Sequence, residues 1–218
     1  MTSLDALRAI AGEQVSRETF DRVRKFSDRF MVWNARINLA SETSAADLWS
    51  RHIFDSAQLN KLDPVALHWL DLGSGGGFPG VVVALLLRDR PGATIDLVES
   101  NRKKAGFLQA MIGEFDLPAK VHAVRIEQAS DLIRNVGVVT ARAVAPLDRL
   151  LLLSLPWLGA GAKALFHKGR DYRNEIADCD DRWQFDLLEH PSVIDRSSAV
   201  LQISRLRLKE AGPEEVKT

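Results

Sequence analysis

The sequence predicts an α/β protein, with a doubly wound, mostly parallel β-sheet, an antiparallel edge and an N-terminal helical cap. Three observations predict this fold. Residues 1–62 carry apolar residues at helical spacing. From residue 66 onward, short apolar runs alternate with helical segments, which is typical of parallel strands joined by helices. The last two predicted strands follow one another directly, which indicates a hairpin at one edge. We therefore expect a cap at residues 1–62 and a Rossmann-like domain at residues 63–218.

Two apolar stripes predict the helices of the cap. Between Ser16 and Arg36 the apolar residues recur every three or four positions, with charges between them, and the segment Ala45–Leu59 repeats this pattern. Asp63 and Pro64 end the helical region, because a residue before proline is disfavoured in a helix. The first stripe consists of Phe20, Val23, Phe26, Phe30, Trp33 and Ile37.

The elements of the domain follow in order along the chain. Strands are predicted at Ala66–Leu72, Thr94–Val98, Lys120–Val124, Val136–Thr140, Ala162–His167, Trp183–Leu188 and Ala199–Leu208. Helices are predicted at Pro79–Arg88, Arg102–Glu114, Gln128–Arg134 and Leu147–Leu155, and a polar segment begins at Asp171.

The composition excludes several classes of protein. The 218 residues include 29 Lys and Arg and 29 Asp and Glu, and 46% are hydrophobic. These values exclude a collagen, a disordered tail and a strongly basic coat protein, although a neutral total can hide a basic face. The single cysteine, Cys179, forms no internal disulfide, and five scattered histidines predict no metal site. The apolar stretch Val81–Leu87 is too short to cross a bilayer, and the N-terminus does not read as a signal peptide, so we expect a cytoplasmic protein without a membrane partner.

The segment after the first strand predicts a ligand site. Gly73, Gly75 and Gly77 leave room for a ligand to approach the backbone closely. Pro79 suits the first turn of the following helix, whose free N–H groups favour a polar or anionic ligand. In an open α/β sheet, ligands bind at the carboxyl ends of the strands, where this loop lies.

Two cofactor classes compete for this loop. The segment Gly75–Gly80 matches the dinucleotide pattern Gly-x-Gly-x-x-Gly, which alone is a weak signal. The segment Asp71–Gly77 reads Asp-x-Gly-x-Gly-x-Gly, which is typical of S-adenosylmethionine (SAM) sites, with Asp71 binding the methionine ammonium directly or through water. Glu99 ends the second strand, where a carboxylate accepts ribose hydroxyls in either class. An NAD(P)-dependent oxidoreductase is disfavoured, because the Tyr-x-x-x-Lys pair of short-chain dehydrogenases is absent.

Several motifs together resemble one bacterial family. They cover roughly residues 20–170, and the chain is similar to the small-subunit ribosomal RNA guanine-N7 methyltransferases, also known as glucose-inhibited division protein B. The motifs are Trp33-Asn34 through Asn38-Leu39, Arg51–Ser56, Gly73–Gly80, Glu99-Ser100, Lys103-Lys104, Phe107-Leu108, Ala141–Ala143 and Lys168-Gly169.

The resemblance implies a class I SAM-dependent methyltransferase with an N-terminal helical cap, whose product is S-adenosylhomocysteine. It implies methylation of guanine N7 in 16S rRNA, at position 527 of the 530 loop. Because a neutral net charge predicts weak binding to naked nucleic acid, we expect the substrate to be a small ribosomal subunit or an assembly intermediate. We also expect a monomeric enzyme. Lys103 and Lys168 fall on positions attributed to substrate RNA. The cofactor-contacting positions fall on Gly73, Phe78, Ile126, Glu127 and Arg142.

The chemistry agrees with an N7 acceptor. Guanine N7 has an exposed lone pair and no proton, so the enzyme needs positioning rather than a general base. The Asp/Asn-Pro-Pro-Tyr/Phe motif of amino-group methyltransferases and the cysteine motifs of pyrimidine methyltransferases are absent. A methyltransferase acting on a non-RNA substrate stays an alternative.

Five residues are candidates for positioning the substrate or the cofactor. Arg142 is expected at the mouth of the site. His52 and Asp55 share a helical face, and Asn34 and Asn38 lie one turn apart near a helix end. A structural hydrogen bond for the first pair and a capping role for the second are the alternatives.

The charge distribution predicts a local basic surface. Residues 100–125 carry a net charge of +3 and residues 142–173 carry +4, whereas residues 174–199 carry −5. Because the basic segments follow strands of the sheet, we expect them at the ligand-binding end, and we expect the acidic segment to face away.

Overall fold

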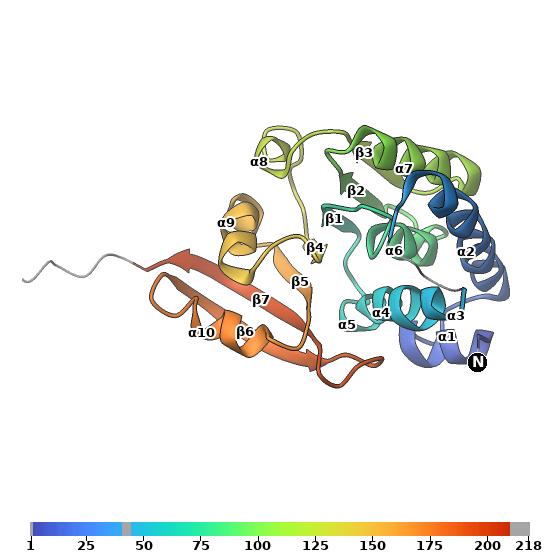
Figure 1. Cartoon of the computed structure of the whole chain (residues 1–218). Coiled ribbons are helices and arrows are strands. Elements are labelled where there is room, and N and C mark those ends of the chain that lie inside the picture. The colour runs from blue at the N-terminus through green and yellow to red at the C-terminus, as the bar shows by residue number, and fades with distance from the viewer. Residues whose placement is uncertain (1, 41–44, 210–218) are drawn as a thin grey trace, which may run out of the picture.

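A computed structural model of the chain describes residues 2–40 and 45–209. Over these residues seven strands form one sheet in the order β3-β2-β1-β4-β5-β7-β6, with helices on both faces (Figure 1). β1 to β5 are parallel, whereas β7 is antiparallel to β5 and β6. The predicted parallel sheet with an antiparallel edge is confirmed. The strands are β1 (His68–Leu72), β2 (Thr94–Val98), β3 (Ala119–His122), β4 (Val138–Arg142), β5 (Lys163–Lys168), β6 (Trp183–Pro191) and β7 (Ala199–Leu208).

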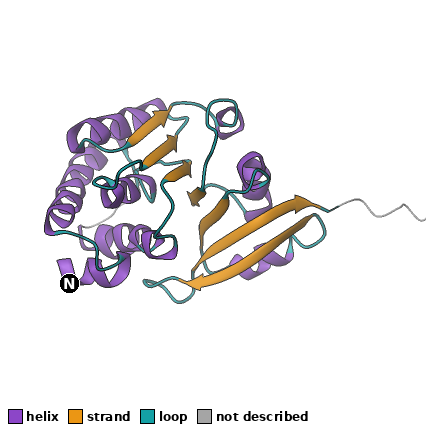
Figure 2. Ribbon diagram, turned by 180° about the vertical axis from the view of Figure 1, so that it is seen from behind, coloured by secondary structure: helices purple, strands orange, loops and turns teal. Residues whose placement is uncertain are grey.

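Two helical layers enclose the sheet, as both views show (Figures 1 and 2). One layer consists of α6, α7 and the cap, and the other of α8, α9 and α10. Side chains alternate along each strand, so Trp69 of β1 packs into the first layer and Leu70 into the second. The helices of the domain are α6 (Gly80–Leu87), α7 (Arg102–Phe115), α8 (Ile126–Ala129), α9 (Leu147–Leu158) and α10 (Tyr172–Ala177).

The predicted cap helices are present, and one apolar cluster joins them to the domain. Phe26 and Phe30 of α2 are fully buried and contact Phe107 of α7 at ring-centroid distances of 6.5 and 6.1 Å. The division at residues 62 and 63 stays a prediction, and residue 1 and residues 210–218 lie outside the described residues. The cap elements are α1 (Leu4–Ala11), α2 (Arg17–Ile37), α3 (Ala45–Asp47), η1 (Leu48–Ile53), α4 (Phe54–Ala57) and α5 (Leu59–Leu62).

One turn of the cap departs from the predicted α-helix. η1 is π-helical, and the backbone N–H of Phe54 donates to the carbonyl of Trp49, five residues earlier. Leu48 and Ile53 are both fully buried and are also five residues apart. A π turn places residues i and i+5 on one face, so it buries both pairs on the same side. The rings of Trp49 and Phe54 contact each other at a centroid distance of 5.5 Å.

Some element boundaries differ from the prediction. β3 ends at His122 rather than Val124, because its only neighbour, β2, ends at Val98 opposite it. β4 runs two residues further along the chain than predicted, since it pairs with both β1 and β5 up to their carboxyl ends. Helix α8 begins before the predicted Gln128–Arg134 segment and is shorter. Helix α10 lies in the segment expected to be merely polar, and Tyr172 is its only buried residue, so no apolar stripe indicates it.

No helix among residues 2–40 and 45–209 is long and apolar enough to span a membrane.

Candidate functional site

The glycine loop after β1 is shaped by positive backbone φ angles. Gly73, Gly75 and Gly77 have φ of +67°, +52° and +87°, which favour glycine. A Cβ at Gly73 would lie 2.9 Å from Cγ2 of Val144, and one at Gly77 would lie 2.7 Å from Cγ2 of Val81. A Cβ at Gly75 would meet only the carbonyl oxygen of Gly73, at 3.6 Å. Packing within the protein thus requires the outer two glycines, whereas Gly75 faces open space that a ligand can occupy.

Glu99 joins the end of β2 to this loop. Its Oε2 accepts a hydrogen bond from the backbone N–H of Gly75 at 2.9 Å, and its Oε1 accepts one from the N–H of Asn101 at 2.6 Å. Each carboxylate oxygen has two acceptor lone pairs, so one on each oxygen is left for a ribose hydroxyl. The side chain is 8% exposed. This placement fits the predicted role of Glu99 toward a nucleoside.

Asp71 holds the elements beneath the loop together. The residue is 1% exposed, and its carboxylate accepts hydrogen bonds from the N–H of Gly80 at 3.1 Å and from the hydroxyl of Thr140 at 2.8 Å. Burial is the main reason that the pKa of Asp71 rises to about 6. The side chain thus connects β1 to α6 and to β4. Its contact with the cofactor ammonium stays a prediction.

The remaining predicted cofactor residues lie around the loop. Phe78 is half-buried and contacts the ring of Phe30 at 5.1 Å and that of His52 at 5.2 Å between centroids. Ile126 is half-buried at the start of α8, while Glu127 is exposed and forms an ion pair with Arg149 at 2.7 Å. An open glycine cradle, a carboxylate with spare lone pairs and an apolar rim fit the adenosine and amino-acid parts of SAM.

Arg142 connects the end of β4 to the cap. Its Nη2 donates to Nδ1 of His52 at 2.5 Å, and its Nη1 lies 3.6 Å from Oδ2 of Asp55. A guanidinium has no acceptor, so Nδ1 of His52 carries no proton. Burial, followed by the charge of Arg142, lowers the pKa of His52 to about 4. His52 is therefore neutral near pH 7, and its lone pair is already taken.

Asp55 is shared between the cap, the sheet and the β6–β7 turn. Its Oδ1 accepts hydrogen bonds from Nε2 of Gln58 at 2.7 Å and from Oγ of Ser192 at 3.1 Å. Its backbone carbonyl lies 2.8 Å from Nε2 of His167, which must donate this bond. Burial lowers the pKa of His167, so this imidazole is also neutral near pH 7.

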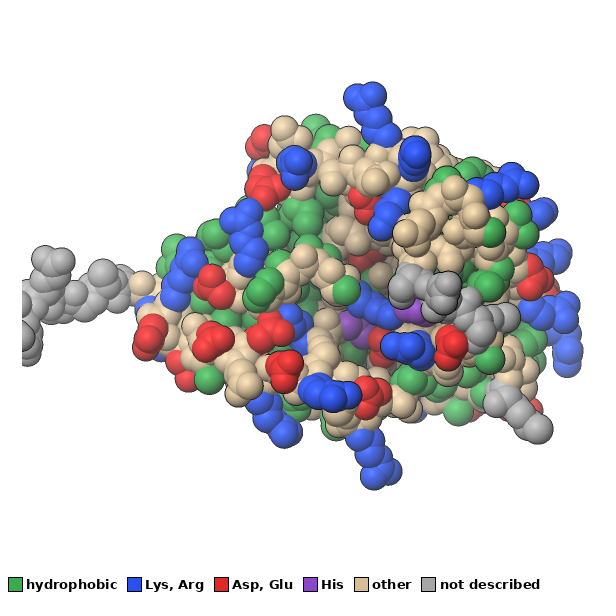
Figure 3. Space-filling view, viewed as in Figure 1, with side chains coloured by type: hydrophobic (Ala, Val, Ile, Leu, Met, Phe, Trp, Pro, Cys, Tyr) green, Lys and Arg blue, Asp and Glu red, His purple; other side chains and the backbone are tan. Residues whose placement is uncertain are grey.

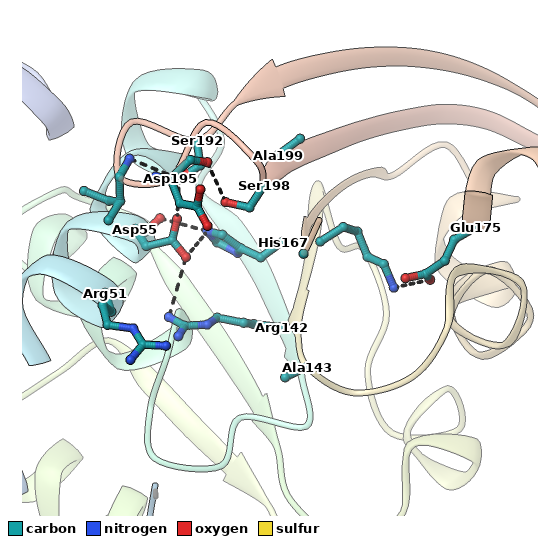
Figure 4. Close-up of a pocket in the computed structure, with 13 residues that line it drawn as sticks. Arg51, Asp55, Arg142, Ala143, His167, Glu175, Ser192, Asp195, Ser198 and Ala199 are labelled. Atoms are coloured by element: carbon teal, nitrogen blue, oxygen red, sulfur yellow. Dashed lines mark hydrogen bonds and ion pairs between the residues drawn. The ribbon is translucent and has the colours of Figure 1, made fainter. Parts of the chain in front are cut away.

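A pocket of about 450 Å³ lies at the carboxyl ends of β4 and β5 (Figure 4). Lys168 lines it. The side chain of Lys168 is 8% exposed, and its ammonium forms an ion pair with Glu175 and donates to the carbonyl of Ala145 at 3.1 Å. The other lining residues are Arg51, Asp55, Arg142, Ala143, His167, Gly169, Glu175, Ser192, Ile194, Asp195, Ser198 and Ala199.

The expectation that the acidic segment faces away from the site is wrong. Glu175 and Asp195, both within residues 174–199, line the pocket. The cause is the antiparallel insertion of β7 beside β5, which pairs Ala199 with Lys168 and returns the β6–β7 turn to the ligand-binding end of the sheet. In the space-filling view, basic, acidic and histidine side chains meet in the hollow between the cap and this hairpin (Figure 3).

Three other predicted residues lie outside the pocket. Oδ1 of Asn34 accepts hydrogen bonds from the N–H groups of Leu39 and Ala40, at 2.7 and 2.8 Å, which is the alternative capping role. Asn38 is exposed and ends α2 with a left-handed φ of 52°. Lys103 is exposed in the first turn of α7.

Several pocket residues were not among the predicted site residues. His167 is one of five scattered histidines, although its place at the carboxyl end of a predicted strand is a usable signal. Ser192 and Asp195 carry no such signal, because only the return of the hairpin brings them to the pocket. Among the described residues, no cluster of three or more His, Cys, Asp or Glu side chains could hold a metal ion.

The chain matches a known protein family over most of its length. Residues 20–202 match the family described as rRNA small subunit methyltransferase G. Proteins named ribosomal RNA small subunit methyltransferase G from Brucella canis and Brucella abortus are 54% identical over 205 residues, which is 94% of this chain and 96% of each relative.

Solved structures with a similar fold include several methyltransferases. A putative O-methyltransferase from Klebsiella pneumoniae has a TM-score of 0.59 and 16% identity, covering 82% of this chain and 89% of its own. An O-methyltransferase from Bacillus cereus in complex with S-adenosylhomocysteine has a TM-score of 0.58 and 13% identity, covering 83% and 91%. At these identities the likeness concerns the fold, which is the predicted class I methyltransferase fold.

Proposed function

The chain belongs to the rRNA small subunit methyltransferase G family, and from that premise we propose that it methylates N7 of a guanine in 16S rRNA. It is a SAM-dependent methyltransferase, and the family decides between the two cofactor classes of the sequence analysis in favour of SAM. The proposed target is position 527 of the 530 loop, as implied by the motif resemblance. The proposed setting is a small ribosomal subunit or an assembly intermediate in the cytoplasm, with the enzyme acting as a monomer.

Different residues of the chain bind the cofactor and the acceptor base. The glycine loop and Glu99 hold the nucleoside part of the cofactor, and Phe78 and Ile126 supply apolar contacts beside it. When bound, SAM supplies an electrophilic methyl group. Arg142 lies on the border between this loop and the pocket, because it contacts His52, which in turn contacts Phe78. The acceptor base therefore enters from the side of the pocket, next to Arg142.

The hydrogen bond from Arg142 to His52 carries the proposal. An acceptor that loses a proton calls for a nearby base with a free lone pair. The lone pair of His52 is occupied by Arg142, and the carboxylate of Asp55 is held by Gln58, Ser192 and Arg142. Guanine N7 has no proton to lose, so a site in which the His52 lone pair and the Asp55 carboxylate are already engaged suits it. Positioning alone supplies about 7–11 kcal/mol in favourable cases.

The basic surface supports an RNA substrate. Arg102, Lys103 and Lys104 are adjacent at the start of α7, directly after β2, and Arg102 and Lys103 are exposed. Arg51 lines the pocket, and it is exposed, as are Arg170 and Arg173, which closely follow Lys168 along the chain. Such side chains contact phosphates and give affinity that falls with salt, without reading the sequence of bases.

The test is to map N7-methylguanine in 16S rRNA from cells with and without this protein. Borohydride–aniline treatment cleaves RNA at N7-methylguanine and leaves methylated amines intact. We expect cleavage at the target guanine only when the protein is present. A chain carrying Arg142→Ala, which removes the contacts to His52 and Asp55, should leave the target guanine largely uncleaved. Cleavage that is unaffected by deletion of the protein would contradict the proposal.

A further inference from the structure

The pocket in Figure 4 lies beside the cofactor loop rather than within it. Its lining residues come from the cap, the ends of β4 and β5, α10 and the β6–β7 turn. None of them belongs to the glycine loop, and Glu99 is absent from the lining. Its volume of about 450 Å³ falls within the range of roughly 300–1,000 Å³ that is usual for ligand pockets. The pocket is therefore the space left for the methyl acceptor.

The pocket has a positive and a negative side. Arg51 and Arg142 lie on one side of the Asp55–His167 pair in Figure 4, and Asp195 lies on the other. Of these two arginines, Arg142 is the one on the side of the cofactor loop, because it contacts His52. The order in Figure 4 is thus the guanidinium groups of Arg51 and Arg142, then Asp55, which pairs with Arg142, together with the neutral His167, and then the carboxylate of Asp195.

Asp195 has one carboxylate oxygen available. Its Oδ1 accepts hydrogen bonds from the backbone N–H and the hydroxyl of Ser197, at 2.9 and 2.7 Å. These bonds are the main reason that the pKa of Asp195 is lowered, and nearby Arg170 lowers it further. No described residue makes a hydrogen bond to Oδ2. The aspartate is therefore ionised near pH 7 and offers a free acceptor at the pocket.

We propose that Asp195 is a specificity-determining residue that reads the N1–H and N2–H groups of the acceptor guanine, while Arg142 donates to O6. This inference rests on the proposed function. Around a guanine ring, N7 is followed by O6 and then by N1–H and the 2-amino group. With N7 toward the cofactor, O6 falls beside Arg142 and the two donors fall toward Asp195. The order of charges in the pocket matches the order of groups on the base.

The same arrangement rejects adenine. Adenine places an amino group where guanine has O6, so two donors would face each other at Arg142. It also places the N1 lone pair where guanine has N1–H, against the Asp195 carboxylate. Specificity then comes from two repulsive contacts as well as from the attractive ones.

The test compares guanosine with inosine at the target position of 16S rRNA assembled into small-subunit particles. Inosine keeps N7, O6 and N1–H and lacks only the 2-amino group. Single-turnover methylation by the full chain should be about 10- to 100-fold slower on inosine, since Asp195 then lacks one partner. Asp195→Asn should slow methylation of guanosine and bring the two rates to within a factor of about two. SAM binding, measured by calorimetry, should be unchanged in this variant.

Asp181→Asn is the matched control. Asp181 is also exposed, and it lies before the start of β6, whereas Asp195 follows its end. The nine residues of β6 separate the two positions by about 30 Å. This variant makes the same change of charge and should keep the wild-type ratio of guanosine to inosine rates.

Two results would overturn the inference. One is that the wild-type enzyme methylates inosine as fast as guanosine. This result can be obtained without any variant. The other is an Asp195→Asn variant that keeps the wild-type ratio. A wild-type enzyme that methylates neither base would contradict the proposed function itself, so the two failures are distinguishable.

Discussion

Glu99 accepts a hydrogen bond from the backbone N–H of Gly75, at 2.9 Å, and so ties the end of β2 to the loop after β1. The two residues are 24 positions apart, yet they lie together at the predicted cofactor site. Because the carboxylate both shapes the loop and offers lone pairs to a ribose, its removal affects binding in two ways.

Glu99→Ala should weaken SAM binding by about 1–3 kcal/mol, the usual cost of leaving polar partners unpaired. Calorimetry with SAM measures this change, and thermal unfolding shows that the fold persists. Glu114→Ala is a suitable control, because Glu114 forms an ion pair with Arg29 and lies outside the glycine loop and the pocket. Wild-type affinity in Glu99→Ala would mean that Glu99 does not contact the cofactor.

The substitution Gly73→Val should do more than fill the space that the cofactor would occupy. Its Cβ would press on Val144, and its φ of +67° is unfavourable for valine. We expect a loss of stability together with a loss of SAM binding. Gly75→Ala adds only one methyl group toward open space, so it should weaken SAM binding with a smaller loss of stability. Calorimetry measures the loss of SAM affinity and denaturant unfolding measures the loss of stability. The ratio of the first loss to the second should be larger for Gly75→Ala than for Gly73→Val.

The pH profile of methyl transfer tests the role of His52. Its pKa of about 4 keeps it neutral from pH 6 to 9, so the single-turnover rate with saturating RNA should be flat over that range. Below about pH 5, protonation places a second cation against Arg142, and the rate should fall. His52→Ala should lower the rate by a similar factor across pH 6 to 9. A log-linear rise with pH that His52→Ala abolishes would reveal a general base and exclude the N7 acceptor.

Lys103 and Lys168 should respond differently to alanine substitution. Lys103 is exposed, so Lys103→Ala should weaken RNA binding and reduce the slope of log affinity against log salt by about one, with SAM affinity unchanged. A filter-binding titration at several salt concentrations measures this slope. An unchanged slope would remove Lys103 from the RNA surface.

Lys168→Ala should also destabilise the fold. Its ammonium is nearly buried against Glu175, whose carboxylate would lose its counter-charge. We expect a loss of about 1–3 kcal/mol of unfolding free energy, measured with denaturant. The double variant Lys168→Met with Glu175→Gln should recover part of this loss, because no buried charge is left unpaired. Equal losses in the single and double variants would show that the ion pair is not the cause.

The stability of the fold should report the buried Asp71 carboxylate. The pKa of Asp71 is about 6 in the folded chain against an ordinary value of 3.8, so the unfolded chain releases this proton first. Its contribution to stability is therefore greatest below about pH 4 and is lost as the pH rises to 6. The loss is about 3 kcal/mol. Relative to wild type, Asp71→Asn should gain stability over that window by up to this amount. A constant difference between the two proteins from pH 4 to 7 would contradict the raised pKa.

Most strands and helices, in their order along the chain, and the glycine loop predicted to bind the cofactor could be recognised from local sequence patterns. Apolar periodicity separates helices from strands because each buries one face with its own repeat. The glycines after β1 and the carboxylate after β2 are fixed by short-range geometry, since a loop between a strand and its helix needs unusual φ angles near the ligand. The family motifs in residues 20–170 lie on these same local features.

Which side chains from distant segments meet in the pocket at the ends of β4 and β5 depends on the tertiary structure. Asp55 and Ser192 are 137 positions apart, and no local pattern predicts that they share a hydrogen bond. Their contact follows from β7 entering the sheet antiparallel beside β5, which brings an acidic turn to the ligand-binding end. Short-range periodicity specifies the conformation of each segment, whereas strand pairing across the chain specifies which segments meet. For that reason the predicted cofactor residues could be named from local motifs, while the place of Asp195 in the pocket and the ion pair of Lys168 with Glu175 could not.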